Sequence, residues 1–171
     1  GSGRVLIPLL EKGLNIEGVD SSEEMLSSCK QRCQDKQVSP PNLYQQYLQQ
    51  LQLPKKYGCI YIPNGSIQLI PNREDTLLAL IKIREHLLDD GFLLLETFVP
   101  WGLIKECIHG QQITGSHVNA FNKKALSPQG YELHYSGLET TQPKAQKTTI
   151  EGRYTKIANN NVMEAEEETY H

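Results

Sequence analysis

The stretch that decides the fold is residues 1–26, GSGRVLIPLLEKGLNIEGVDSSEEML. Val5–Lys12 has the apolar spacing of a helix, and Gly13 follows it as a residue that commonly ends one. Asn15–Asp20 predicts a short strand. Ser21, with Glu24 three residues later, forms an S-x-x-E capping box that predicts a helix reaching about Gln34. A glycine turn, a helix, a strand and a second helix in this order are typical of an α/β protein.

The residues up to Pro100 extend this alternation. Asn42–Leu48 is a weaker strand candidate, and Tyr57–Pro63 is a clear one because it is rich in β-branched and aromatic residues. A helix is predicted over Arg73–Leu88 and a strand over Phe92–Phe98. The last two strands are apolar without alternation, which predicts strands buried on both faces in a mostly parallel sheet with helices on both faces.

The hydrophobic period changes after Pro100. Tyr131–Thr140, Thr148–Ile157 and Val162–Tyr170 alternate polar with apolar or long side chains, and Asn159–Asn161 supplies turn residues. This pattern predicts an antiparallel β-meander with one face in water.

Composition excludes several classes of protein. The chain has 171 residues, of which 38% are hydrophobic, and a net charge of −3, so one domain is expected and nucleic acid is not the default partner. The longest apolar runs are far below the roughly 20 residues that cross a membrane, and no secretory signal is visible. The cysteines show no zinc-binding pattern, so we expect free thiols, no metal site and a cytoplasmic location; they are Cys29, Cys33, Cys59 and Cys107.

The opening residues suit a nucleotide. Small residues in the turn Gly1–Gly3 allow the backbone to approach a ligand closely, and the helix that follows offers free N–H groups. Asp20 ends the next strand, where a carboxylate can accept hydrogen bonds from two ribose hydroxyls.

These features together resemble a class I S-adenosylmethionine-dependent methyltransferase of the small-molecule type. The resemblance runs from Gly1 to about Pro100, and Gly1 and Gly3 match the last two glycines of that family's first motif. It implies a Rossmann-like cofactor-binding core over residues 1–100 and an antiparallel roof over residues 101–171, inserted after the family's fifth strand. It also implies that the family's first strand and its final helix and hairpin lie outside the sequence, which is therefore expected to be truncated at both ends.

The resemblance also assigns residues to the cofactor. Gly1, Ser2 and Gly3 would lie against its amino-acid and ribose portions, and Asp20 would hold the ribose hydroxyls. Ser21, Met25, Tyr47 and Leu48 would border the adenine, and Pro63, Asn64 and Ser66 would line the methyl-transfer pocket. Two positions depart from the family pattern, because Tyr47 stands where an acidic residue is common and Gly58 where Asp is common.

The implied reaction is in-line displacement of the methyl group of S-adenosylmethionine by a nitrogen or oxygen atom of a small molecule, with S-adenosylhomocysteine as the product. A general base is needed only when the acceptor arrives protonated. The candidate catalytic residues on the roof are Tyr131, His134 and Tyr135, with Glu96 as a further carboxylate; an ordinary structural role is the simpler interpretation of His134.

Two alternatives remain open. A nicotinamide-dependent Rossmann domain would have a third glycine near the first helix, where Arg4 and Val5 stand instead. A non-catalytic cofactor-binding or interaction module is compatible with the departures at Tyr47 and Gly58. Neither a membrane nor a nucleic acid is an expected partner, and a homodimer is compatible with the pattern. The acidic run Glu164–Glu168 is either a solvated strand or an attraction for a cationic amine.

Overall fold

The computed structural model describes residues 1–99 and 115–170. The chain divides into two compact units, the first comprising Gly1–Ile62 and Asn72–Leu95, the second Pro63–Pro71 and Glu96–His171. The predicted boundary between residues 100 and 101 lies outside the described residues. Within the part that is described, no helix combines the length and the apolar character needed to cross a membrane.

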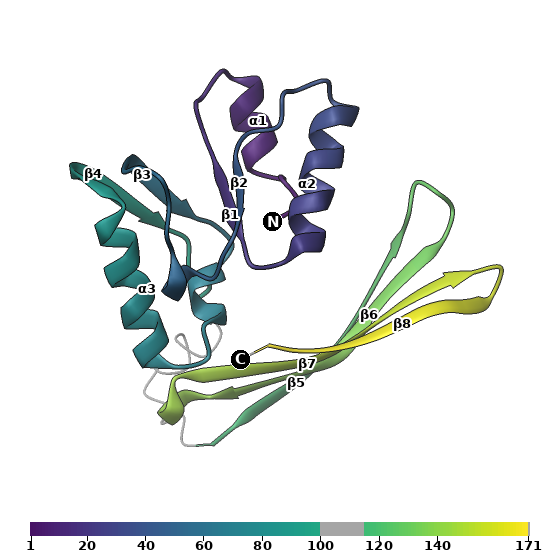
Figure 1. The fold of residues 1–171 in the computed structure, drawn as a ribbon. Helices are drawn as coiled ribbons and strands as arrows, with labels where there is room; N and C mark the ends of the chain where they lie inside the picture. The colour runs from purple at the N-terminus through teal and green to yellow at the C-terminus, as the bar shows by residue number, and fades with distance from the viewer. Residues whose placement is uncertain (100–114, 171) are drawn as a thin grey trace. The chain divides into compact units, whose positions relative to one another are not determined.

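The first unit is built from two βαβ segments (Figure 1). Strands β1 and β2 pair in parallel, as do β3 and β4, and a helix joins the two strands of each pair. This arrangement confirms the predicted Rossmann-like α/β class. In chain order the elements are α1 (Leu6–Glu11), β1 (Gly18–Asp20), α2 (Glu23–Asp35), β2 (Leu43–Gln45), a 3₁₀ turn (Leu48–Gln50), β3 (Tyr57–Ile62), α3 (Arg73–Glu85) and β4 (Leu87–Leu95).

A small apolar core holds α1 against α2. Ile7, Cys29 and Cys33 are almost completely buried and contact the partly buried Leu6, Leu10 and Leu43. Cys29 and Cys33 stand four residues apart on α2 and act as small apolar side chains, and burial raises the pKa of the Cys29 thiol. Both thiols are free, as is the exposed Cys59; Cys107 lies outside the described residues.

The capping-box pattern predicted Ser21 as the N-cap of α2, but the structure has Ser22 at this position. The Ser22 hydroxyl accepts a hydrogen bond from the Met25 backbone N–H at 3.1 Å and donates one to Glu24 at 2.8 Å. The start shifts by one residue because the Ser22 N–H is held by Asp20 at the end of β1.

The boundary between α3 and β4 also differs from the prediction. The helix ends at Glu85 instead of Leu88, and the strand runs over Leu87–Leu95 instead of Phe92–Phe98. Leu87 has already joined β3 by pairing with Tyr57, so its strand pairing overrides the helical period. His86 fixes the boundary, because its Nδ1 lies 2.8 Å from the Lys82 carbonyl and its Nε2 accepts the Leu53 N–H at 2.8 Å.

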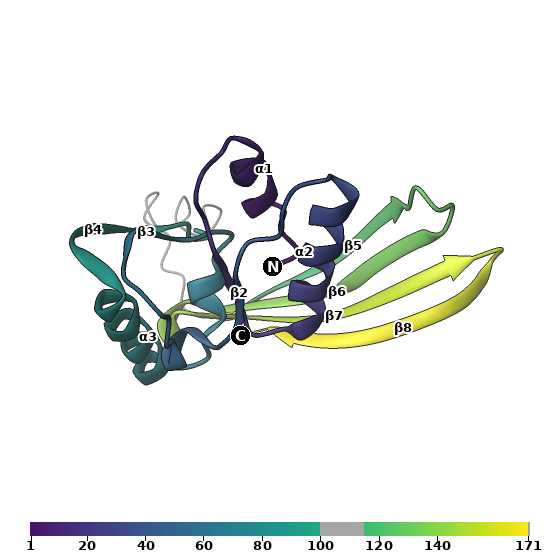
Figure 2. The same ribbon diagram turned by 45° about the horizontal axis from the view of Figure 1, so that its top comes forward.

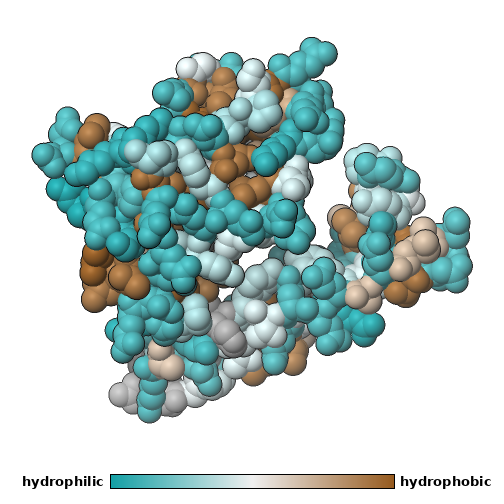
Figure 3. Space-filling view, viewed as in Figure 1, coloured by the Kyte–Doolittle hydropathy of each residue, from teal (hydrophilic) through white to brown (hydrophobic). Residues whose placement is uncertain are grey.

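The prediction that β4 is buried on both faces is wrong. Phe92 and Leu94 are more than half exposed, because the strand lies in a two-stranded sheet with α3 packed against it. Helix α3 also leaves apolar side chains exposed, and Figure 3 shows an apolar patch over it.

Glu17 ties the two strand pairs together at their amino ends. Its Oε1 accepts a hydrogen bond from Asn42 and pairs with Lys55 Nζ, both at 2.9 Å. Its Oε2 accepts from the hydroxyls of Tyr44, at 3.3 Å, and Tyr57. The Tyr57 hydroxyl and then the Lys55 ammonium lower the pKa of Glu17 to about 2.

The second unit contains one four-stranded antiparallel sheet, seen as a long twisted layer in Figures 1 and 2. Its order is β5-β6-β7-β8, which confirms the predicted meander. Asn159 and Asn160 adopt the left-handed conformation in the turn before the last strand, as expected for asparagine. The strands are β5 (His117–Leu126), which the sequence pattern did not predict, β6 (Glu132–Gln142), β7 (Lys147–Ala158) and β8 (Asn161–Tyr170).

Candidate functional site

The glycine turn at the start of the chain is tightly packed. Gly3 is buried with φ of +81°, a conformation that favours glycine. A Cβ at this position would lie 2.7 Å from the Cys29 Sγ and 2.8 Å from the Ile7 Cδ1. The Gly3 carbonyl accepts the Ile7 N–H at 3.0 Å, so the turn leads directly into α1. The backbone at Gly3 therefore lies close to α2, in a space where a side chain at this position would not fit.

Asp20 occupies the carboxyl end of β1, as predicted. Its Oδ1 accepts the Ser22 N–H at 2.9 Å, and its Oδ2 accepts a hydrogen bond from the Gly1 nitrogen. About a quarter of its side chain is exposed. Since each carboxylate oxygen accepts two hydrogen bonds, Asp20 has acceptor capacity left for the hydroxyls of a ligand. The structure therefore brings Gly1 and Asp20, two of the predicted site residues, into direct contact.

The end of β2 lies beside the end of β1. Asp20 is opposite Gln45 in the parallel pair, and the Gln46 N–H donates to the Asp20 carbonyl at 3.0 Å. Tyr47 follows and is 56% exposed, and the next residue, Leu48, is half-buried. The carboxyl ends of parallel strands are where open α/β sheets bind ligands.

Two predicted residues lie at the start of α2. Ser21 is exposed, and its carbonyl accepts a hydrogen bond from Gln45 Nε2 at 3.3 Å. Met25 is 47% exposed, an unusual state for a flexible apolar side chain that can cover a ligand. Both follow Asp20 closely in the chain, and neither is buried in the core.

Arg32 makes a contact with Ser2 that the sequence analysis did not predict. From α2 its Nη1 donates to the Ser2 carbonyl at 3.0 Å and to the Ser2 hydroxyl at 3.3 Å. Its position three residues after Cys29 on α2 was the only available signal, because it places Arg32 near the face that packs against the turn. Arg32 fixes Ser2, so the turn is held on both sides of Gly3.

The predicted residues Pro63, Asn64 and Ser66 belong to the second unit and form a tight turn there. The Ser66 hydroxyl donates to the Pro63 carbonyl at 2.8 Å, and the Asn64 N–H donates to the Glu96 carboxylate at 2.8 Å. Gly65 has a φ of +67° and contacts Phe98, since a Cβ there would lie 2.5 Å from its ring.

The sheet separates the predicted catalytic residues. Successive residues of a strand point to opposite faces, so His134 and Tyr135 lie on opposite sides of β6. His134 Nε2 is 2.8 Å from the Glu132 carboxylate on its own strand. Tyr131 lies beneath Lys156, whose Nζ is 4.7 Å from the ring centroid. Burial, and then the Glu168 carboxylate, raise the pKa of Tyr135, so its hydroxyl is a donor at neutral pH.

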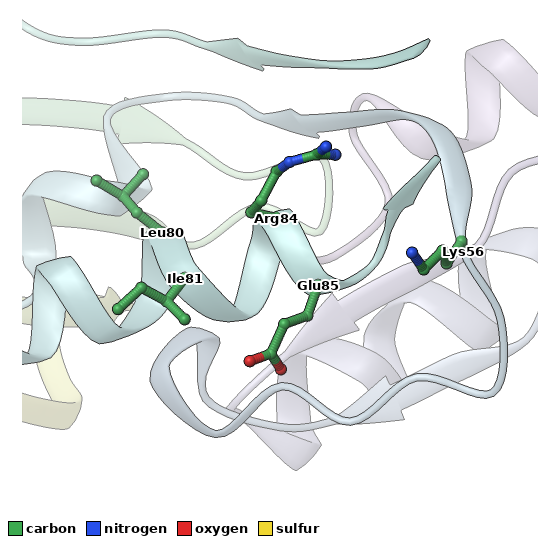
Figure 4. Close-up of a pocket in the computed structure, with 5 residues that line it drawn as sticks. All are labelled: Lys56, Leu80, Ile81, Arg84 and Glu85. Carbon is green, nitrogen blue, oxygen red and sulfur yellow. The ribbon is translucent and has the colours of Figure 1, made fainter. Parts of the chain in front are cut away.

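A shallow groove in the first unit contains none of the predicted site residues. It is lined by Leu80, Ile81, Arg84 and Glu85 of α3 and by Lys56 from the segment before β3 (Figure 4). Lys56 precedes the amino end of β3, so the groove is not at the carboxyl ends of the strands. Among the described residues, no group of three His, Cys, Asp or Glu side chains is placed to hold a metal ion.

Comparison with known proteins agrees with this geometry. The model of a family described as a methyltransferase domain matches residues 1–91, more than half of the chain. A "Putative methyltransferase" of Geobacillus sp. (strain WCH70) is 27% identical over 96 residues, which are 56% of this chain and 38% of that protein.

Two solved structures have a similar fold. An S-adenosylmethionine-dependent methyltransferase from Clostridium acetobutylicum has a TM-score of 0.75 and 19% identity, over 99% of this chain and 62% of that chain. The sugar N-methyltransferase KedS8 from Streptoalloteichus sp. has a TM-score of 0.68 and 16% identity, again over 99% of this chain and 62% of that chain. The chain thus spans less than two thirds of the length of each of these relatives.

Proposed function

The chain belongs to the methyltransferase domain family, and from this premise we propose that it binds S-adenosylmethionine and serves methyl transfer to a nitrogen or oxygen atom of a small molecule. In this proposal residues 1–100 form the cofactor-binding core and residues 101–171 cover the acceptor. The similar fold of a sugar N-methyltransferase supports a small acceptor.

The observation that carries the proposal is the position of Asp20. It ends β1, contacts Gly1 of the glycine turn and retains acceptor capacity on a partly exposed carboxylate. Ribose hydroxyls are donors, so this carboxylate suits a nucleoside. Gly1, Ser2 and Gly3 would face the amino-acid portion with backbone groups, and Arg32 would keep Ser2 in place.

The adenine would lie between the ends of β1 and β2. Ser21 and Met25 would contact one side, while the exposed Tyr47 ring and Leu48 would contact the other. Tyr47 replaces the acidic acceptor that the family resemblance implies, so we expect the adenine to be held more by stacking than by a hydrogen bond to its amino group. Pro63, Asn64 and Ser66 would border the methyl group, with Gly65 allowing the backbone to turn.

When bound, S-adenosylmethionine supplies a methyl group on a positively charged sulfur, open to in-line displacement. The residues of this chain then have to position the acceptor and exclude water. Since Tyr135 keeps its proton, it would orient an acceptor as a hydrogen-bond donor and not take a proton from it. His134, on the other face of the sheet, is the predicted residue whose ring nitrogen can accept a proton, and Tyr131 is occupied by Lys156.

The decisive experiment is calorimetric titration of S-adenosylhomocysteine into the wild type and Asp20→Asn. The variant keeps the size of the side chain but loses its charge, so we expect affinity to fall by about 1–3 kcal/mol, or roughly 5- to 150-fold. Asp35→Asn, at the far end of α2, makes the same chemical change and should bind like the wild type. Equal affinities for the wild type and Asp20→Asn would refute the ribose contact.

The two alternatives predict different results. A nicotinamide-binding domain would be stabilised against thermal unfolding by NAD and not by S-adenosylhomocysteine, which would overturn the proposal. A non-catalytic module would bind S-adenosylhomocysteine but transfer no radiolabelled methyl group to any amine or phenol tested.

A further inference from the structure

The turn after β3 and the segment after β4 are joined by hydrogen bonds from two side chains. Gln68, in the 3₁₀ turn Ser66–Leu69, donates from Nε2 to the Phe98 carbonyl at 3.1 Å and accepts the Phe98 N–H on Oε1 at 2.6 Å. The Glu96 carboxylate accepts the Asn64 N–H at 2.8 Å. The segment after β4 is therefore attached to the turn at two points.

Gln68 acts as the pairing partner of Phe98. Strand β4 ends at Leu95, so Phe98 lies beyond the residues that pair with β3. An amide side chain offers both a donor and an acceptor, and here they are used on the carbonyl and the N–H of one residue. Gln68 is itself fixed, because its N–H donates to the Gly65 carbonyl at 2.8 Å and the preceding residue, Ile67, is buried. These contacts fix the backbone of Phe98.

The ring of Phe98 is positioned without being buried. A Cβ on Gly65 would lie 2.5 Å from the Phe98 Cδ2 and 2.8 Å from its Cε2, so this side of the ring packs on the Gly65 backbone. Only a residue without a Cβ allows this contact. Phe98 is nevertheless 71% exposed. The open surface of the ring is therefore presented in a defined place, set by a pair of hydrogen bonds and a glycine.

Phe98 contacts the turn that carries the proposed methyl-transfer residues. Gly65 stands between Asn64 and Ser66, two of the residues expected to border the methyl group. The turn follows the carboxyl end of β3, and α/β sheets bind ligands outside the carboxyl ends of their strands. The Glu96 carboxylate adds a negative charge to the turn. Since the face of an aromatic ring also attracts a cation, the ring and the carboxylate together suit a positively charged group.

We propose that Phe98 is a further residue of the cofactor site, where its ring faces the positively charged sulfur of S-adenosylmethionine, and that Gln68 is the positioning residue that holds it there. This inference rests on the proposed function, because it needs the cofactor bound with its methyl group at the turn. It adds a preference between two forms of the cofactor. S-adenosylmethionine and S-adenosylhomocysteine differ by one methyl group and the positive charge on sulfur, so the ring stabilises the first and not the second.

The test is calorimetric titration of each compound, without an acceptor, into the wild type and Phe98→Leu. Leucine keeps an apolar side chain but has no aromatic face. We expect the affinity for S-adenosylmethionine to fall about two- to five-fold, the effect of losing a cation–π contact at an exposed site, and the affinity for S-adenosylhomocysteine to stay unchanged. Phe98→Tyr keeps an aromatic face and should restore the wild-type preference. Equal losses of affinity for the two compounds in Phe98→Leu would overturn the proposal.

Phe92→Leu is the matched control. Phe92 is also exposed, at 61%, but it stands opposite Cys59 within the paired part of β4, before the strand ends. The variant should bind both compounds like the wild type. The same loss of preference in Phe92→Leu as in Phe98→Leu would contradict a specific role of Phe98.

Gln68→Met tests the positioning role. Methionine has a side chain of similar length that makes neither hydrogen bond, so we expect the preference for S-adenosylmethionine to be lost as in Phe98→Leu. Because Gln68 acts through Phe98, the double variant should lose no more than Phe98→Leu alone. Additive losses would mean that Gln68 acts by another route and would overturn its positioning role. Near-UV circular dichroism establishes that each variant is folded.

The two proposals fail in distinguishable ways. A wild type that binds neither compound would remove the proposed function and the role of Phe98 with it. A wild type that binds both compounds, and is weakened by Asp20→Asn but keeps its preference in Phe98→Leu, would leave the proposed function and remove the role of Phe98 alone.

Discussion

At the scale of single residues, Gly3 and Gly13 show how one backbone conformation serves two purposes. Both have φ near +80°, which disfavours any residue with a Cβ. At Gly13, which follows α1, a Cβ would have no atom within 4 Å, whereas at Gly3 it would meet Cys29 and Ile7. Gly13 is therefore required by conformation alone, and Gly3 by conformation and packing.

This difference gives a prediction for alanine substitutions. Gly13→Ala should lower the free energy of unfolding by about 1–2 kcal/mol, the cost of the left-handed conformation. Gly3→Ala should cost a further 1–3 kcal/mol or so, because the added methyl group overlaps the Cys29 sulfur and the Ile7 side chain. Urea unfolding of both variants measures the two costs. Equal losses would mean that the core around Cys29 yields without strain.

At the scale of elements, His86 joins α3 to the segment before β3. Its Nε2 accepts the Leu53 N–H, so this nitrogen carries no proton and the other, Nδ1, donates to the Lys82 carbonyl. The segment that Leu53 ends begins with the 3₁₀ turn at Leu48–Gln50, which packs against α3. The imidazole therefore helps to position Tyr47 and Leu48 by holding the segment that follows them against α3.

His86→Leu should loosen this segment without unfolding the protein. We expect the Leu53 amide to exchange with solvent about five-fold faster, the effect of losing a hydrogen bond worth about 1 kcal/mol. His134→Leu is the matched control, because the His134 ring pairs with an exposed glutamate on its own strand and not with the segment of Leu53, and it should leave Leu53 unchanged. Unchanged exchange in His86→Leu would show that the loop is held by its other contacts.

The elements also show what a sequence pattern can predict. Helix α2 and strand β3 were predictable because their apolar periods and end signals agree. Strand β5 was not, because the apolar residues of HVNAFNKKAL do not alternate regularly with polar ones, and the segment gains its structure from ten paired positions with β6. The end of α3 was misplaced because Leu87 and Leu88 continue a helical period, while pairing with Tyr57 places Leu87 in a strand.

The residues of the candidate site also differ in how far the sequence could predict them. Asp20 was predictable because its place depends on a local order of turn, strand and helix. The contact of Arg32 with Ser2 joins residues thirty positions apart, and the position of Glu168 next to Tyr135 depends on strand register. A local sequence pattern reveals neither a contact between distant segments nor the register of a strand pair.

At the scale of the whole molecule, stability in acid should depend on Glu17. The folded state lowers its pKa from 4.5 to about 2, so the unfolded chain binds a proton that the folded chain does not. The stabilisation is complete above pH 5 and is lost as the pH falls from about 4.5 to about 2. It amounts to no more than about 3.5 kcal/mol, since one pKa unit corresponds to about 1.4 kcal/mol.

The measurement is urea unfolding of the wild type and Glu17→Gln across this range. The difference in unfolding free energy between the two proteins should be largest above pH 5 and shrink toward pH 2. Glu11→Gln removes an equal charge from an exposed pair with Lys36 and should follow the wild-type pH dependence. A Glu17→Gln difference that is constant with pH would contradict the linkage.

The stacked Tyr135–Tyr154 pair gives the second unit an optical signature. Two identical chromophores with centroids 4.1 Å apart and nearly parallel planes couple when they absorb light. Their near-ultraviolet circular dichroism should therefore contain a coupled tyrosine signal that the isolated side chains lack. This signal reports directly on the register of β6 and β7, so the folding of the sheet can be followed without a label.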